Sequence, residues 1–170
     1  MLETVTHSLA PVIDAESQLL LLGTMPSPKS RETGFYYGHP QNQFWNVLAV
    51  VFDTGTPQSI PEKLAFLHSH HIALWDVLHS CEINGAEDSS IRNPVVHDIP
   101  SLLSKAPIRQ IFTTGKKATA LYKKYCFPNT QRASIYLPST SAANRGRFPF
   151  TELVREYSIL RTFLTGAPPY

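Results

Sequence analysis

Four consecutive leucines, Leu19 to Leu22, constrain the fold more than any other feature of this sequence. Gly23 closes the run, and Pro26 and Pro28 follow it, so turn residues bound a short apolar segment. An apolar run of this length between turn signals is typical of a buried strand. We therefore expect residues 18–23 to form the first core strand.

Further short runs of apolar or β-branched residues alternate with segments of helical periodicity. The expected strands are 18–23, 72–75, 108–113 and 134–137. The expected helices are 44–52, 59–70 with a capping-box spacing at its start, 115–125 and 151–164. This alternation predicts an α/β fold of three layers, α/β/α, with a central four-stranded parallel sheet in one domain over residues 1–170.

Ligands of open parallel sheets bind beyond the carboxyl ends of the strands. The segments that follow the expected strands are 23–43, 76–94, 113–117 and 138–148, and they hold most of the Gly, Ser, Asn and Thr clusters. We therefore expect small hydrogen-bonding residues to converge on one edge of the sheet.

The two halves of the chain carry opposite charge. Residues 1–85 have 3 Lys or Arg against 8 Asp or Glu, and residues 86–170 have 12 against 5. No acidic residue lies between Asp98 and Glu152. This basic stretch can face phosphates, or it can be a set of solvated helix faces and loops, and charge alone favours neither.

Several classes of protein are disfavoured by what the sequence lacks. It has no P-loop, GxGxxG or GxSxG motif, and no apolar run reaches membrane-spanning length. The first 18 residues lack an apolar signal region, which predicts an intracellular, cytoplasmic protein without a membrane partner. Cys81 and Cys126 fit no disulfide framework and are too few for an iron-sulfur cluster, so we expect two buried thiols.

No metal and no cofactor are expected. His68, His70 and His71 end an expected helix, where histidines usually face solvent or favour the negative end of the helix dipole. No second ligand cluster completes a tetrahedral metal site with them.

The segment after the first expected strand has the composition of a pocket lining. Tyr36 or Tyr37 can stack on a base, which contributes roughly 1 to 3 kcal/mol, or either can be a core residue. Asn42 cannot abstract a proton, but its amide can place a water and hydrogen-bond a departing base while an N-glycosidic bond breaks. Alternatively, Asn42 caps the expected helix that begins at Phe44.

The segment after the last expected strand is rich in groups that bind phosphate. Hydrogen bonds or positive charge are offered there by Ser139, Thr140, Ser141, Asn144, Arg145 and Arg147. The segment can hold a DNA backbone around an extruded base, or it can be a basic surface turn.

Two motifs resemble those of the hypoxanthine-DNA glycosylases, a branch of the uracil-DNA glycosylase superfamily. The first motif consists of Gly23-Thr24-Met25-Pro26-Ser27, Tyr36-Tyr37, His39-Pro40 and Asn42-Gln43-Phe44-Trp45. The second motif is Leu137-Pro138-Ser139-Thr140-Ser141. The likeness extends through 72–76, 88–91 and the turn at Gly115, so it covers most of the chain from about Leu19 to the final helix.

The resemblance implies a monofunctional glycosylase that uses water to release a deaminated base in base-excision repair. Asn42 matches the position of the catalytic Asn, and Tyr37 matches that of an aromatic residue that stacks on the base, with Tyr36 as its support. The expected base-binding residues are Gly23, Thr24, Met25, Pro26, Tyr36, Tyr37 and Thr114. The expected DNA-binding residues are Ser27, Lys116, Ser139, Thr140, Ser141, Asn144, Arg145 and Arg147.

Two departures favour a purine as the target base. Met25 stands where the mismatch-specific uracil glycosylases carry an Asn, and Thr114 belongs to a turn where a base-reading Asn is expected. We therefore expect a monomer that acts on DNA containing deoxyinosine. The alternatives are a xanthine- or uracil-directed glycosylase, a hydrolase of free nucleosides or nucleotides, and a noncatalytic binder of damaged or single-stranded DNA.

Overall fold

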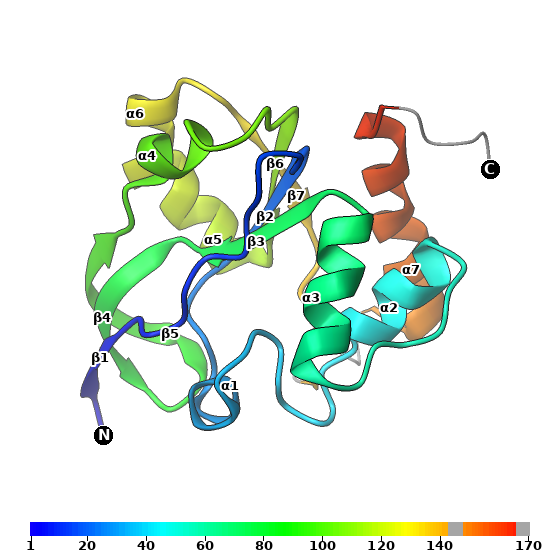
Figure 1. Cartoon of the computed structure of the whole chain (residues 1–170). Coiled ribbons are helices and arrows are strands. Elements are labelled where there is room, and N and C mark those ends of the chain that lie inside the picture. Colours follow the sequence, from blue (N-terminus) through cyan, green and yellow to red (C-terminus); the bar gives the residue numbers. More distant parts are fainter. Residues whose placement is uncertain (143–147, 166–170) are drawn as a thin grey trace.

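The computed structural model describes residues 1–142 and 148–165, which form two sheets and the helices around them (Figure 1). The strands are β1 (Glu3–Thr6), β2 (Leu19–Gly23), β3 (Ile72–Asp76), β4 (Leu78–Asn84), β5 (Glu87–Val96), β6 (Gln110–Thr114) and β7 (Ser134–Leu137). The helices are α1 (Pro28–Thr33), α2 (Phe44–Val51), α3 (Ile60–Ser69), α4 (Ile99–Leu103), α5 (Lys116–Leu121), α6 (Phe127–Thr130) and α7 (Phe150–Tyr157). A π-helical turn, η1 (Tyr122–Cys126), joins α5 to α6, and a 3-10 helix, η3 (Ser158–Phe163), follows α7.

The four-stranded sheet is parallel throughout and has the order β3-β2-β6-β7. The run from Leu19 to Leu22 forms the inner strand β2, and all four side chains are 0% exposed. Leu19 and Leu21 pack with α2, α3 and α7, whereas Leu20 and Leu22 pack with α4 and α5. The run lacks polar residues because helices cover both faces of the strand.

The helices form a layer on each side of the parallel sheet, with α2, α3 and α7 on one side and α4, α5 and α6 on the other (Figure 1). The expected α/β fold with a four-stranded parallel sheet is confirmed. The expected capping box is also present, since Glu62 N donates to Ser59 Oγ and Ser59 N donates to Glu62 Oε1. Cys81 and Cys126 are both 2% exposed, as expected for buried thiols.

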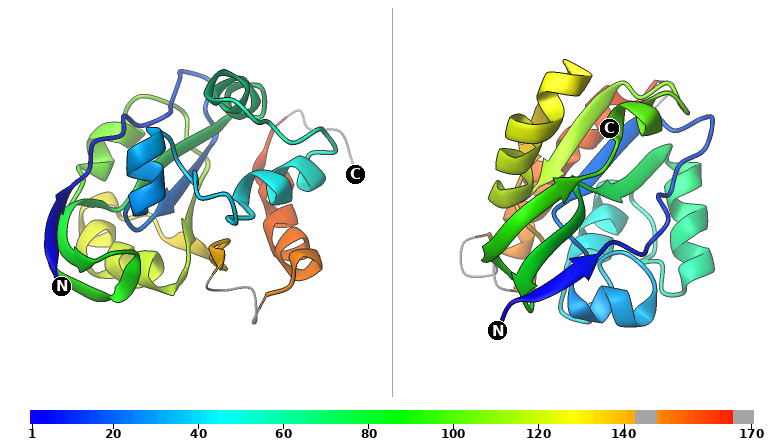
Figure 2. Two further views of the ribbon diagram at one scale, coloured as in Figure 1. Left: turned by 90° about the horizontal axis from the view of Figure 1, so that it is seen from below. Right: turned by 90° about the vertical axis from the view of Figure 1, so that its left-hand side faces the viewer.

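A second sheet has no counterpart in the sequence prediction. The sequence patterns predict no strand over residues 76–94, yet β4 and β5 form an antiparallel hairpin there, and β1 pairs with β4 (Figure 2). The pairing of β4 with β5 is broken by three register irregularities, and Gly85 turns between the strands with φ 59°. These irregularities remove the strict alternation by which a strand is recognised in a sequence.

No helix among the described residues is long and apolar enough to cross a membrane.

Candidate active site

A pocket of about 150 Å³ opens at the carboxyl ends of the parallel strands. Gly23 ends β2, Asp76 ends β3 and Thr114 ends β6, and all three line the pocket. We call it the strand-end pocket.

Most of the residues predicted from the sequence meet there. The predicted residues that line the strand-end pocket are Gly23, Thr24, Met25, Pro26, Ser27, Tyr36, Tyr37, Asn42, Thr114, Ser139, Thr140 and Ser141. Lys116 does not line it but lies in an adjoining groove. Asn144, Arg145 and Arg147 lie outside the described residues.

The amide of Asn42 has a fixed orientation. Its Oδ1 accepts a 2.9 Å hydrogen bond from the backbone N–H of Phe44 and a 2.8 Å bond from the hydroxyl of Thr140. Both partners are donors here, so the atom facing them is the oxygen, and its two lone pairs are used. Nδ2 makes no hydrogen bond to any described residue, and Asn42 presents the pocket with a donor.

Asn42 therefore also holds the start of α2, which is the alternative role that its position suggested. The bond to Phe44 satisfies a backbone N–H at the first turn of that helix. A second connection runs beside it, because Gln43 N donates to the carbonyl oxygen of Thr140 at 3.0 Å. The capping bond and the bond from Thr140 together keep the amide group in place.

Tyr37 has one aromatic face covered and lines the pocket. Its ring stacks on Phe44 with centroids 3.8 Å apart and planes 5° apart. Its hydroxyl lies 3.4 Å from Oγ1 of Thr114. Burial and the charge of Asp76 raise the pKa of Tyr37, so its hydroxyl stays protonated.

Tyr36 is buried and its polar groups are hydrogen-bonded within the protein. Tyr36 is 3% exposed, and its hydroxyl donates a 2.7 Å hydrogen bond to the carbonyl oxygen of Ala10. The carbonyl oxygen of Tyr36 accepts a hydrogen bond from Nε1 of Trp45. These contacts suit the supporting role that the resemblance gave to Tyr36.

Two of the predicted DNA-binding side chains bond inward. Thr140 is 2% exposed and gives its hydroxyl hydrogen to Asn42. Ser27 caps α1, where its Oγ accepts from the backbone N–H of Ser30 at 3.2 Å. Ser139 and Ser141 bond to each other and line both the pocket and the adjoining groove.

A buried acidic residue in the pocket was missing from the predicted site. Asp76 is 4% exposed, and its Oδ2 lies 2.8 Å from Nε2 of His7, whose side chain is 1% exposed. The backbone oxygen of Asp76 accepts a 2.8 Å bond from Nδ1 of His97. Asp76 directly follows the expected strand 72–75, so the rule about strand ends could have found it; His7 has no comparable signal.

The β4–β5 hairpin forms another wall that the sequence did not predict. Ile83, Gly85, Ala86 and Asp88 line the pocket from this hairpin. Asp88 is exposed at the rim, where partial desolvation raises its pKa and the nearby charge of Lys117 opposes that shift. The wall brings a second carboxyl group to the rim of the pocket.

A groove of about 570 Å³ adjoins the pocket and carries positive charge. Lys116 and Lys117 lie along it, together with Tyr136, Ser139 and Ser141, and Asp88 is the one acidic residue among its described lining. We call it the basic groove. Lys116 and Lys117 begin α5, so the groove belongs to the part of the chain that the sequence marks as basic.

Within residues 1–142 and 148–165, no group of three or more His, Cys, Asp or Glu side chains is placed to hold a metal ion. His68 instead pairs with Asp14 at 2.8 Å, and His70 Nδ1 lies 2.9 Å from the carbonyl oxygen of Phe66.

Comparisons with known proteins agree with this geometry. The family model described as the uracil DNA glycosylase superfamily matches residues 10–158. Proteins named hypoxanthine DNA glycosylase from Methanosarcina acetivorans and Methanosarcina barkeri are each 32% identical, over 79% of this chain and 85% of their own length. A solution NMR structure of a candidate uracil DNA glycosylase from Methanosarcina acetivorans superimposes with a TM-score of 0.78 at 28% identity, over 93% of this chain and 99% of that one. This chain belongs to the uracil DNA glycosylase superfamily.

Proposed function

We propose that this protein is a DNA glycosylase that hydrolyses the N-glycosidic bond of deoxyinosine and releases hypoxanthine for base-excision repair. Two relatives at 32% identity carry the name hypoxanthine DNA glycosylase, which supports the deaminated purine as the target. The observation that carries the proposal is the arrangement of Tyr37 and Asn42. The strand-end pocket offers a stacked aromatic surface and one amide donor that makes no hydrogen bond to any described residue.

In this proposal the flipped base stacks on Tyr37, whose other face rests on Phe44. Asn42 Nδ2 donates to an acceptor of the base, such as N7 or O6 of hypoxanthine. The base leaves with the electron pair of the broken bond, so a donor fixed in advance stabilises the transition state more than the ground state.

Water is the proposed nucleophile, which makes the enzyme monofunctional. A glycosylase that forms a covalent intermediate uses an amine, and the described lining of the strand-end pocket contains no lysine. Lys116 and Lys117 line the adjoining basic groove instead.

The substrate is DNA rather than a free nucleoside, because the groove beside the pocket is lined by Lys116, Lys117 and Ser139. Positive charge and short hydroxyls along a groove suit a phosphate backbone. We propose that a monomer within the cell grips the strand there, with Arg145 and Arg147 as further contacts.

The decisive experiment is incubation with labelled duplexes that each carry one deoxyinosine, deoxyuridine or deoxyxanthosine, followed by alkaline cleavage of abasic sites. The expected result is strand breakage at deoxyinosine. Breakage mainly at deoxyuridine or deoxyxanthosine would keep the glycosylase and change its substrate. Binding of these duplexes without breakage would contradict catalysis and favour a noncatalytic binder.

A further inference from the structure

Resting on the proposed function, we propose that Asp76 is a catalytic base that orients and deprotonates the attacking water, and that His7 positions its carboxylate. The observations behind it are one carboxylate oxygen fixed by a buried histidine and one oxygen that remains open to the pocket. Neither residue belongs to the two motifs that carry the resemblance, although the likeness extends through 72–76.

The carboxylate of Asp76 is held on one side only. Its Oδ2 lies 2.8 Å from His7 Nε2, and its Oδ1 has no hydrogen-bond partner among the described residues. Oδ1 is not sealed in the core, since the fully enclosed polar side-chain atoms that lack a partner in the described chain are His71 Nδ1 and Trp75 Nε1. Because Asp76 lines the strand-end pocket, Oδ1 is available to a water molecule there.

Oδ1 occupies space that the neighbouring strand leaves free by ending in a glycine. Gly23 of β2 is paired in register with Asp76 of β3. A β-carbon at Gly23 would lie 2.6 Å from Asp76 Oδ1 and 3.3 Å from the hydroxyl oxygen of Tyr37. The open carboxylate oxygen and the tip of the stacking tyrosine thus approach the same point at the end of the sheet.

The backbone of Asp76 is equally constrained. Its carbonyl oxygen accepts the hydrogen bond from His97 Nδ1, and the next residue, Val77, donates its N–H to the carbonyl oxygen of Gly23 at 2.8 Å. A catalytic group must be held within fractions of an ångström of its working position, and these bonds supply that constraint.

The other polar groups of the pocket are less suited to accept a proton from water. Both lone pairs of Asn42 Oδ1 are occupied, so Asn42 can only donate toward the pocket. Tyr37 keeps its proton because burial and the charge of Asp76 raise its pKa. Asp88 lies on the hairpin wall, and no histidine among the described residues fixes its carboxylate.

The reaction balances with water as the only co-reactant. The water oxygen forms a bond to C1′ of the sugar while the bond from C1′ to N9 breaks, and the base takes that electron pair. One water proton passes to Asp76 Oδ1 and then to the departing hypoxanthine, directly or through solvent. The products are the abasic sugar and neutral hypoxanthine, and Asp76 returns to its carboxylate form.

His7 is a positioning residue in this scheme, because it touches the carboxylate and not the substrate. It follows β1, the outer strand of the second sheet, and precedes residues 10–158 that match the family model. Its ring lies edge-on to that of His97 with centroids 4.6 Å apart. The amino-terminal strand therefore contributes a partner for the site from outside the matched span.

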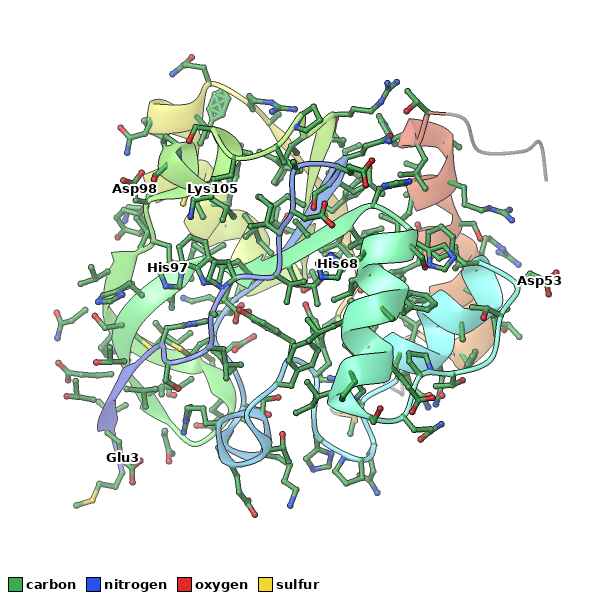
Figure 3. All side chains as sticks on the ribbon, in the orientation of Figure 1. Glu3, Asp53, His68, His97, Asp98 and Lys105 are labelled. Carbon is green, nitrogen blue, oxygen red and sulfur yellow. The ribbon has the colours of Figure 1, made fainter. Side chains whose placement is uncertain are left out.

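The test measures single-turnover excision from a deoxyinosine duplex by the full chain, beside the affinity for the same duplex and the melting temperature. We expect Asp76→Asn to slow excision by at least about 100-fold, the usual contribution of a general base, with duplex affinity retained. Asp53→Asn is the matched control, because Asp53 is exposed at the end of α2, away from His97 (Figure 3), and its φ of 52° suits Asn. Excision by Asp53→Asn should equal that of the unaltered protein.

Chemical rescue separates catalysis from folding. Asp76→Ala removes the carboxylate, and added formate should restore excision in a concentration-dependent manner without changing the unaltered protein. His7→Gln keeps a donor at the position of Nε2 and should retain most activity, whereas His7→Phe should lose about 10- to 100-fold in rate, the contribution of a hydrogen bond to a charged group. If both Asp76 variants fail to fold, the comparison of His7→Gln with His7→Phe still tests whether the carboxylate of Asp76 takes part in excision.

Two outcomes are distinguishable from the start. If the unaltered protein excises none of the deaminated bases, the proposed function fails. If it excises deoxyinosine and folded Asp76→Asn does so at the same rate, or if His7→Gln and His7→Phe lose activity equally, the role of Asp76 and His7 is overturned while the function stands.

Discussion

The hydroxyl of Thr140 donates a 2.8 Å hydrogen bond to Oδ1 of Asn42, although 98 residues separate the two in the chain. The bond joins the loop after β7 to the segment after β2, and Thr140 is 2% exposed. Phe44 N is the only other donor that Oδ1 meets among the described residues. The orientation of the proposed catalytic amide therefore depends on a buried contact between two distant motifs.

Replacing Thr140 by Val should loosen this amide without changing the shape of the core. A net hydrogen bond contributes about 0.5 to 1.5 kcal/mol, so we expect single-turnover excision of deoxyinosine to slow by about 2- to 10-fold. Thr140→Ser keeps the hydroxyl and is the matched control. Equal rates for the Val and Ser variants would show that the bond does not orient Asn42.

Asn42 itself is tested best by Asp, which keeps an acceptor for Phe44 and Thr140 but loses the Nδ2 donor. We expect Asn42→Asp to excise deoxyinosine about 100- to 1,000-fold more slowly, as for the removal of one preorganised donor from an active site. The melting temperature should change little, because the cap on α2 remains. Excision at the normal rate would contradict a role for Nδ2 in base departure.

The parts of the structure that the sequence predicted are those with local signals. The leucine run predicted strand β2, and the capping-box spacing at Ser59 predicted the start of α3. Because ligands of parallel sheets bind beyond the carboxyl ends of the strands, the sequence also placed Asn42 and Tyr37 at that edge of the sheet. These patterns arise within a few residues of the element that they define. They require no knowledge of which strands pair.

The contact between His7 and Asp76 could not be predicted in the same way. The two residues are 69 positions apart in the sequence. They meet because β1, which His7 follows, pairs with β4, the strand that begins just after Asp76. The β4–β5 hairpin that places Asp88 at the pocket has irregular register and polar exposed positions, so it carries little periodic signal. Long-range pairing of edge strands is set by tertiary packing and leaves no local mark.

Tyr37 and Tyr36 should respond differently to substitution. Tyr37→Ala removes the surface on which a base can stack, and at roughly 1 to 3 kcal/mol per base we expect kcat/KM for deoxyinosine to fall by about 5- to 150-fold. Tyr37→Phe keeps the ring, so its kcat/KM should stay close to that of the unaltered enzyme.

Tyr36→Phe loses the hydrogen bond to the carbonyl oxygen of Ala10. We expect this variant to have a lower melting temperature, with little change in the rate of excision.

The basic groove should control the salt dependence of DNA binding. Replacing Lys116 and Lys117 together by Ala removes two positive charges, so we expect the slope of log K against log salt to decrease in magnitude by up to about 1.8. Lys105→Ala is the control, since Lys105 is exposed beside α4 rather than in the groove (Figure 3). The measurement is duplex affinity between about 50 and 200 mM salt. An unchanged slope in the double variant would place the DNA backbone elsewhere.

His97 should make the protein less stable in mild acid. Burial, together with the charges of His7 and His79, lowers the pKa of His97 from 6.5 to about 4, and the hydrogen bond to the Asp76 carbonyl oxygen opposes this shift. The neutral ring stacks on Trp75 with centroids 3.7 Å apart. The unfolded chain binds a proton near pH 6.5 that the folded chain takes up only near pH 4. The free energy of unfolding therefore falls as the pH drops through this window, by about 2 to 3 kcal/mol from this group. His97→Asn keeps a donor for the Asp76 carbonyl oxygen but cannot titrate. Urea unfolding at pH 7, 5.5 and 4 should show that the free energy of unfolding of the unaltered protein falls relative to that of this variant. If the difference between the two free energies stays constant over this range, His97 does not titrate in it.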